Sequence, residues 1–253
     1  MSAGLLLAGH THAALVSHYT FDDNTNLGAD SGTIGNTAGP GGDGDASFTA
    51  AAKVGAGALE LDGDDSLFIG GIGPNYSVMD DDGDGFTVAA WVNIDPANGG
   101  NSRILSMAMG GGFVGEGFGV GFDLSNDVLA TTYGQVDYNP SSTVPFSTWT
   151  HVAYRFGFNG GADIDTVEFF VNGVSVVTSD PAVNGMNNTV GTFSIGNINI
   201  PGNEQYFTGL IDDLRVYDTE ISNGEIAALA VPEPSSAALL GLGGFALILR
   251  RRF

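Results

Sequence analysis

Short apolar runs separated by turn-forming residues constrain the fold of this chain more than any other feature. Within each run apolar and polar side chains alternate with a period of two, and clusters of Gly, Asp, Asn and Pro separate the runs. Glycine supplies 40 of the 253 residues, which suits tight turns between many strands. The pattern predicts an all-β fold, a two-sheet antiparallel sandwich of a length that one domain commonly has.

Twelve segments carry this strand pattern. They are Val16–Phe21, Ala58–Leu61, Leu67–Ile69, Phe86–Asn93, Arg103–Met107, Gly117–Leu124, Val128–Thr132, Thr150–Phe158, Thr166–Val171, Val174–Thr178, Thr192–Ile195 and Gly209–Tyr217. In the fourth segment Phe86, Val88, Ala90 and Val92 share the face that we assign to the core, and Trp91 lies on the opposite face. The sequence therefore predicts both the strands and the side that each buries.

Two local motifs predict how the strands are joined and how the domain closes. Asn172-Gly173 supplies the positive φ values that a two-residue hairpin turn requires. Ser222, followed by Glu225 three residues later, is a capping box before an apolar stretch. One short C-terminal helix is the only helix that the domain sequence supports.

The charge of the chain limits its partners. Asp and Glu number 29 against 7 Lys and Arg, giving a net charge of −22. Such a surface repels nucleic acid and anionic lipid and attracts cations, so calcium is a candidate ligand. Cysteine is absent, so stability depends on core burial, with a metal ion as a further candidate contribution.

The two ends of the chain differ in composition from the domain. Residues 1–14 combine a short apolar stretch with small residues that suit a signal peptidase, although no Lys or Arg precedes them; a truncated start or an ordinary buried strand are the alternatives. At the other end, Val231-Pro232-Glu233-Pro234 precedes a thirteen-residue apolar or small segment, 237–249, and then Arg250-Arg251-Arg252. A helix of that length spans only about 20 Å, short for a permanent anchor.

This C-terminal arrangement of motif, short apolar helix and basic end resembles the PEP-CTERM sorting signal of Gram-negative bacteria. The resemblance implies transient insertion of the tail into the inner membrane, with the arginines cytoplasmic. It also implies an exosortase as processing partner, and release to the cell surface or extracellular matrix. A plain C-terminal membrane helix is the alternative. The resulting division is 1–14 signal peptide, 15–230 folded domain and 231–253 sorting tail.

The domain itself resembles the laminin G-like, concanavalin A-like lectin and glucanase group. Blocks in order carry the resemblance: His18–Asp22, Ala58–Gly63, Phe86–Val92, Trp149–Ala153, Phe169–Gly173, and Phe193–Gly196 followed by Gly209–Tyr217. It implies a jelly roll of two curved antiparallel sheets that often binds glycans or proteins and often carries calcium. Because the fold hosts many activities, function has to be argued from sites.

Two groups of aspartates are candidate calcium ligands. Asp80, Asp82 and Asp84 form an Asp-x-Asp-x-Asp-Gly sequence, in which alternate side chains converge on one ion. It departs from an EF-hand because Trp91 stands where the bidentate Glu belongs. A solvated acidic turn is the alternative.

The second group follows from the family resemblance alone. In that family a calcium ion can link the segment after the first strand to the acidic pair that opens the last strand. Asp22, Asp30 and Asp212 match those positions, with Asp213 as a substitute. The alternative is that Asp212 and Asp213 pair with Arg215 or face solvent.

Carbohydrate recognition requires an aromatic platform, for which Trp91, Tyr133 and Tyr138 are the candidates, although packing is the simpler role for Trp91. Hydrolysis requires paired carboxylates, and no Glu-x-Asp-x-x-Glu arrangement is present. No nucleophile elbow or metal-spaced histidines occur either.

The sequence favours a non-enzymatic exported surface or matrix protein that binds carbohydrate or another matrix component. A purely structural acidic matrix protein is the runner-up, and a glycoside hydrolase a minor alternative.

Overall fold

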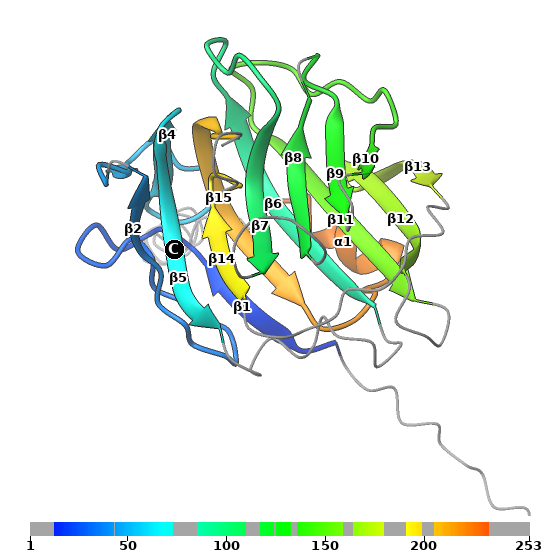
Figure 1. Cartoon of the computed structure of the whole chain (residues 1–253), viewed down its shortest axis with the longest axis horizontal. Coiled ribbons are helices and arrows are strands. Elements are labelled where there is room, and N and C mark those ends of the chain that lie inside the picture. Colours follow the sequence, from blue (N-terminus) through cyan, green and yellow to red (C-terminus); the bar gives the residue numbers. More distant parts are fainter. Residues whose placement is uncertain are drawn as a thin grey trace, which may run out of the picture.

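The computed structural model describes residues 13–42, 44–72, 85–109, 117–123, 125–132, 136–158, 164–179, 191–198 and 205–232. They contain fifteen strands and one helix (Figure 1). The bounds are β1 Leu15–Tyr19, β2 Gly39–Gly42, β3 Ser47–Thr49, β4 Ala58–Asp62, β5 Asp65–Ile72, β6 Phe86–Ile94, β7 Ser102–Met109, β8 Gly117–Phe122, β9 Val128–Thr132, β10 Val136–Tyr138, β11 Thr150–Phe158, β12 Ile164–Val171, β13 Val174–Ser179, β14 Gly191–Ile195, β15 Thr208–Tyr217 and α1 Asn223–Leu229.

The strands form two antiparallel sheets that face each other in a jelly roll. Sheet A has the order β13-β12-β11-β6-β15-β4-β3, and β1 also pairs with β15; sheet B has the order β10-β9-β8-β7-β14-β5-β2. In Figure 1 strands β7 and β8 of sheet B lie in front of β6 and β11 of sheet A. All twelve predicted strands are confirmed. The three that were not predicted are short, and β2 reads Gly-Pro-Gly-Gly, which carries no strand pattern.

The main core lies between the sheets, where the sequence pattern places it. Phe86, Val88, Ala90 and Val92 are buried in this core, and so are the inward residues of β11. The ring of Phe86 stacks on that of Phe156 at 4.4 Å between centroids and contacts Phe118 of sheet B at 5.0 Å. These rings join the two sheets and confirm the predicted core face.

The outer face of sheet A carries a second, smaller core beneath α1. Ile226 of the helix is fully buried and belongs to one cluster with Ala89, Ala153 and Phe170. Ser222 caps the helix with both hydrogen bonds of the predicted capping box. The predicted hairpin turn is also present, with φ of 49° at Asn172 and 77° at Gly173.

No helix in the described part of the chain is long and apolar enough to cross a membrane. The predicted apolar segment at 237–249 and nearly all of the predicted signal peptide lie outside the described residues. Both therefore remain predictions of the sequence.

Candidate functional site

A β-bulge in β15 places two consecutive aspartates on the outer face of sheet A. Opposite β6, the pairing shifts by one residue between Asp212 and Arg215, and Asp213 adopts a φ of 49°. Ile211 and Leu214 on either side both enter the main core. The extra residue of the bulge thus turns Asp212 and Asp213 together away from that core.

Asp212 is fully buried, and only one of its two carboxylate oxygens accepts hydrogen bonds from the described residues. Its Oδ2 accepts hydrogen bonds from the backbone N–H groups of Lys53 at 2.7 Å and Val54 at 2.8 Å. Its Oδ1 has no hydrogen-bond partner among the described residues. Burial raises the pKa of Asp212 to about 6, against the two backbone hydrogen bonds that lower it. A cation beside Oδ1 would offset this cost of ionisation, so the residue fits a metal ligand.

The loop that covers Asp212 is also attached to Asp22. Asp22 Oδ1 accepts hydrogen bonds from the backbone N–H groups of Ala56 and, at 3.0 Å, Gly57. We call residues 53–57 the strap. Two carboxylates from the two ends of the domain, Asp22 after β1 and Asp212 in β15, hold this strap through its backbone.

The other two members of the family-implied calcium set are already occupied by protein donors. Asp30 accepts hydrogen bonds from the backbone N–H groups of His18 and Gly32, both within 2.8 Å, and from two further donors. Asp213 pairs with His18 Nε2 at 2.7 Å and with Arg215. Burial opposes ionisation of Asp213, but these partners outweigh it and lower its pKa.

Within the described ranges, no three of these four carboxylates share ligand atoms within 4.8 Å of one another. The structure places Asp30 and Asp213 in protein-only hydrogen-bond networks. Asp212, whose Oδ1 has no hydrogen-bond partner among the described residues, is the member that still fits a metal ion. The pairing of Asp213 with Arg215 is the alternative that the sequence left open.

Trp91 is packed beneath the strap, which agrees with the simpler packing role that the sequence favoured over an exposed ring. Its side chain is only 4% exposed, it meets the ring of His151 edge-on at 5.4 Å, and Lys53 Nζ lies 4.5 Å from its centroid. Trp91 is directly opposite Asp212 in the sheet, so the strap that Asp212 holds lies over it. A carbohydrate ring cannot stack on this face of the indole.

His151 beside Trp91 is buried and neutral. Burial lowers its pKa to about 4, although the charge of Asp213 raises it. Within the part of the chain that the structure describes, its Nδ1 and the Nε1 of Trp91 have no hydrogen-bond partner. The outer face of sheet A therefore contains a row of buried polar groups, on β15, β6 and β11, that serves packing.

Of the remaining predicted ligands, the structure places only the backbone of Tyr138. Asp80, Asp82, Asp84 and Tyr133 lie outside the described residues. Tyr138 is in β10, where it pairs with Ala130.

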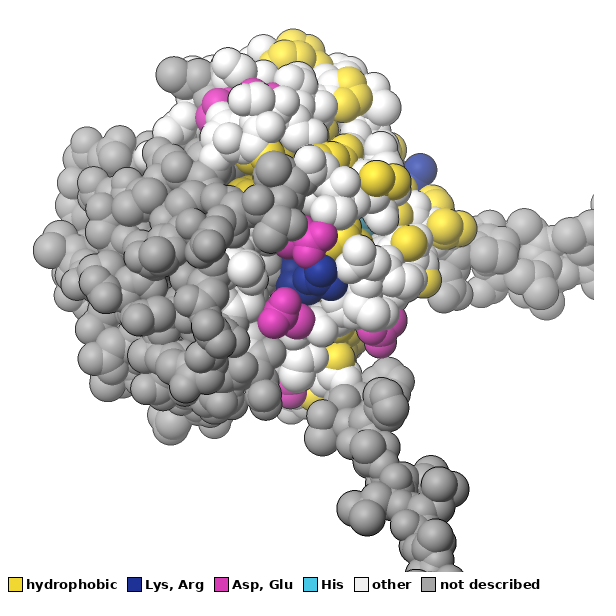
Figure 2. All heavy atoms as spheres, turned by 90° about the vertical axis from the view of Figure 1, so that its right-hand side faces the viewer, with side chains coloured by type: hydrophobic (Ala, Val, Ile, Leu, Met, Phe, Trp, Pro, Cys, Tyr) yellow, Lys and Arg dark blue, Asp and Glu magenta, His cyan; other side chains and the backbone are white. Residues whose placement is uncertain are grey.

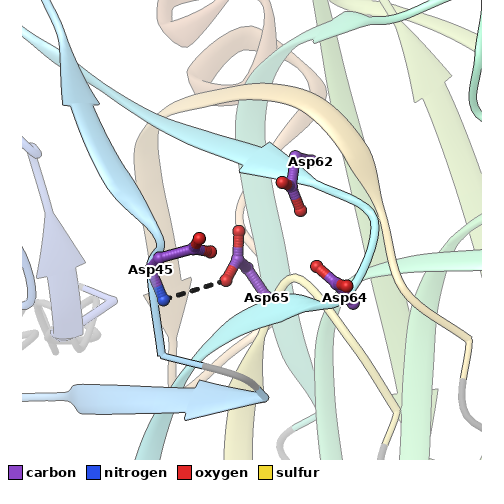
Figure 3. A group of neighbouring side chains, drawn as sticks. All are labelled: Asp45, Asp62, Asp64 and Asp65. Carbon is purple, nitrogen blue, oxygen red and sulfur yellow. Dashed lines mark hydrogen bonds between the residues drawn. The ribbon is translucent and has the colours of Figure 1, made fainter.

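A different group of four aspartates comes together at the turn between β4 and β5. Asp62 ends β4, Asp64 and Asp65 follow, and Asp45 comes from the loop before β3 (Figure 3). One carboxylate oxygen from each of the four lies within 4.8 Å of the other three. The N–H of Asp45 donates to Asp65 Oδ1 at 3.1 Å. Asp65 is buried and the other three are exposed. Clustered carboxylates on a turn are the ligands that calcium prefers.

This cluster opens into a groove of about 630 Å³ on the outer side of sheet A. Besides Asp45, Asp62 and Asp65, the groove is lined by polar side chains from β4, β6 and β15 and their loops, including Glu60, Asn93, Asp95 and Thr208. None of the described residues that line it is aromatic. Its chemistry is that of hydrogen-bond acceptors and negative charge.

Sequence reasoning missed this site. Asp62-Gly-Asp64-Asp65 is a short acidic turn that resembles the one at 80–84, but Asp45 is seventeen residues away and joins it only through the pairing of β3 with β4. Glu60 and Asp62 also alternate along β4, with Leu61 between them in the core, so both carboxylates face the groove. That alternation was readable in the sequence.

The architecture defines this chain as a two-sheet antiparallel jelly roll. The profile of the concanavalin A-like lectin/glucanases superfamily matches residues 74–227, so the chain belongs to that family. The PEP-CTERM protein-sorting motif matches residues 230–252, in agreement with the sequence prediction.

Solved structures with the same fold include several carbohydrate-related domains. Domain 4 of the Geobacillus stearothermophilus arabinanase AbnA, in complex with arabinotriose, is 21% identical with a TM-score of 0.67, covering 87% of this chain and 99% of that domain. The Ruminococcus gnavus sialidase CBM40 bound to sialyllactose is 18% identical with a TM-score of 0.52, covering 69% and 96%. The binding domain of botulinum neurotoxin serotype G is 14% identical with a TM-score of 0.61, covering 85% and 50%. No curated protein matches the sequence. At these identities the similarity establishes the fold.

Proposed function

We propose that this chain is a non-catalytic exported protein whose jelly roll binds carbohydrate in the acidic groove, with calcium held by Asp45, Asp62, Asp64 and Asp65. The convergence of these four carboxylates at the end of the groove is the observation that carries the proposal. The volume of the groove, about 630 Å³, lies within the range of known ligand sites.

The chemistry of the groove supports a hydroxyl-rich ligand. Carboxylates and the amide of Asn93 accept hydrogen bonds from hydroxyl groups, and the amide also donates. A calcium ion in the aspartate cluster would neutralise part of the negative charge and leave coordination positions for sugar oxygens. Without an aromatic platform, affinity in this groove would depend on the ion.

A second calcium ion would have a structural role at the strap. Asp212, whose buried Oδ1 is unpartnered, and Asp22 would hold it. Such an ion would attach the first and last strands of the domain to the strap, in a chain that has no disulfide.

The destination of the protein follows from its sorting motif. The match at 230–252, with Val231 to Pro234 at its start, supports export by an exosortase-dependent route in a Gram-negative bacterium. Transient insertion of the tail in the inner membrane and final release to the cell surface or extracellular matrix are part of the proposal. The sialyllactose and arabinotriose complexes of the similar domains support a glycan as partner.

A glycan array probed with residues 13–232, in calcium and then in chelator, tests the binding proposal. We expect glycan binding that requires calcium and is lost when Asp62 and Asp64 are both replaced by Asn. The control Asp23→Asn makes the same chemical change at an exposed site outside the groove and should leave binding intact. Binding that survives the double variant would contradict the assigned site. No glycan binding, together with calcium-dependent self-association, would instead support a purely structural matrix protein.

One observation also supports a glycoside hydrolase as a second candidate. Glu60 and Asp62 are alternate residues of β4 and both line the groove, as the two carboxylates of such enzymes must. Hydrogen bonding with Asp64 lowers the pKa of Asp62, so Asp62 suits the base or nucleophile and Glu60 would have to be the acid. Release of reducing sugars that Glu60→Gln abolishes would establish this activity; binding without release would exclude it for the glycan tested.

A further inference from the structure

The last helix of the domain and the start of the sorting motif share residues. Helix α1 ends at Leu229, and the matched motif begins at residue 230. The N–H of Ala230 donates to the carbonyl of Ile226, and the N–H of Val231 donates to the carbonyl of Ala228, both at 3.2 Å. The first residues of the sorting motif are therefore hydrogen-bonded into the last turn of the helix, with no spacer between motif and domain.

The domain holds this helix at several points. Ile226 is buried on the outer face of sheet A, and the hairpin turn lies so close that a Cβ added at Gly173 would be 2.8 Å from Ala227 Cα. Arg155 donates to the carbonyl of Ile221 and to Asn223 Oδ1, at 2.9 and 2.8 Å. These contacts hold α1 on the sheet, and Ala230 and Val231 are held with it through their hydrogen bonds to Ile226 and Ala228.

Arg155 is in β11, two strands from the β13 edge of sheet A. It forms ion pairs with Glu168 and Glu220. Figure 2 shows the side of the molecule that carries the β13 edge, where a basic group lies between acidic side chains with hydrophobic side chains nearby. Val174 and Val231 are 65% and 67% exposed. Arg155 thus holds the segment just before α1, through its ion pair with Glu220 and its hydrogen bond to the carbonyl of Ile221.

The helix is nevertheless weak. It has seven residues, includes Gly224, buries only Ile226 and has no basic residue in its last turn to interact with the helix dipole. Helices of this length are not stable without tertiary packing and open as a unit. A population of molecules with α1 open is therefore expected under native conditions.

We propose that helix α1 gates the processing of the sorting tail, because the processing enzyme can bind the start of the motif only after the helix has opened. Peptide-recognising proteins commonly take their substrates as extended segments, and the hydrogen bonds of Ala230 and Val231 exclude that conformation. The gate controls access alone, and the chemistry of cleavage belongs to the enzyme. This inference rests on the sorting step of the proposed function and is independent of glycan binding.

Pulse-chase measurement of the conversion of the full chain to its shortened form tests the gate. The host is a bacterium that also processes a reporter protein carrying residues 231–253 without the domain. If the reporter is not shortened, the sorting step of the proposed function fails; if only the full chain responds differently from expectation, the gate fails. A six-residue Gly/Ser linker between Ala230 and Val231 should speed conversion at least about threefold, since the motif then extends without opening α1. The same linker between Gly99 and Gly100, where Gly100 has open space around it, should leave the rate unchanged.

Two uncharged substitutions away from the motif change the stability of α1 in opposite directions. Ser222→Ala removes the cap and should speed conversion about fivefold, whereas Gly224→Ala, whose Cβ contacts only Ser222 Oγ at 3.9 Å, should slow it about threefold to fivefold. Both effects should disappear when the linker is present. Rates unchanged by the linker, or effects of the two substitutions that persist beside it, would overturn the gate.

Discussion

The strap and the acidic groove contain aspartates that have opposite environments. At the strap, Asp22 and Asp212 each bind two backbone N–H groups, and Asp212 is fully buried. In the groove, Asp62 and Asp64 are exposed, and the four carboxylates lie beside one another. Backbone donors make a carboxylate structural. Carboxylates that converge on one another at a surface are better suited to binding a ligand that does not belong to the protein chain.

Removing the side chain of Asp212 should therefore have the largest effect on stability. Asp212→Ala leaves the N–H groups of Lys53 and Val54 without their acceptor in a buried site, and we expect a loss of about 3 kcal/mol in the free energy of unfolding. Asp62→Ala in the groove should cost less than about 0.5 kcal/mol in chelator. Urea unfolding of the domain measures both.

Asp212→Asn separates hydrogen bonding from charge at the same position. Its amide oxygen can accept the same two hydrogen bonds, so in chelator it should retain most of the stability. If Asn were as destabilising as Ala, the charge of Asp212 and not its hydrogen bonds would hold the strap.

The next prediction concerns the pH dependence of stability and uses two buried groups whose pKa values are shifted in opposite directions. The pKa of Asp212 is raised to about 6, so its contribution to stability is present near pH 4 and is lost as the pH rises through 6. The pKa of His151 is lowered to about 4, so stability falls as the pH drops from 6.5 towards 4, because the unfolded chain then binds the proton more tightly. At about 1.4 kcal/mol per pKa unit, each effect is on the order of 3 kcal/mol.

These two contributions should nearly cancel in the unmodified protein in chelator. Relative to it, His151→Gln should gain stability as the pH falls from 6.5 to 4, and Asp212→Asn should lose stability over the same interval. Asp213 and Arg215, the charged groups that face His151, are unchanged in both variants. Parallel pH profiles for the two variants would contradict this assignment.

Among substitutions at the strap, the smallest expected effect is that of removing the cation above Trp91. Lys53→Met keeps the aliphatic packing but removes the charge 4.5 Å from the ring centroid, and it should cost about 0.5 to 1 kcal/mol. Calcium binding in the groove, measured by calorimetry, should not change. A change there would show that the strap and the groove are coupled, and the comparison between them would no longer separate two independent sites.

The sequence predicted the features that depend on neighbouring residues. Alternation identified the strands and the core face of Phe86 and Val88, and Asn172-Gly173 and the Ser222 cap fixed a turn and a helix. The three strands it missed are short. It left Trp91 open between packing and an exposed platform, because alternation shows which face of a sheet a side chain occupies, but not whether a distant loop covers that face.

The candidate site was predicted less well than the fold. Asp22 and Asp212 were identified as candidate ligands. The bulge that directs Asp212 outward and the four hydrogen bonds that Asp30 accepts depend, however, on strand pairing. The groove cluster was missed because Asp45 and Asp62 become neighbours only across β3 and β4.

The sequence by itself determined the class of fold, the core faces, the acidic character and the sorting tail, because each is encoded in residues close together along the chain. The tertiary structure decided which aspartates are satisfied by the backbone, which converge in the groove, and that α1 holds the start of the sorting motif. Those outcomes depend on contacts between segments far apart in the sequence, such as that of Lys53 with Asp212, which are 159 residues apart, and only folding brings such segments together.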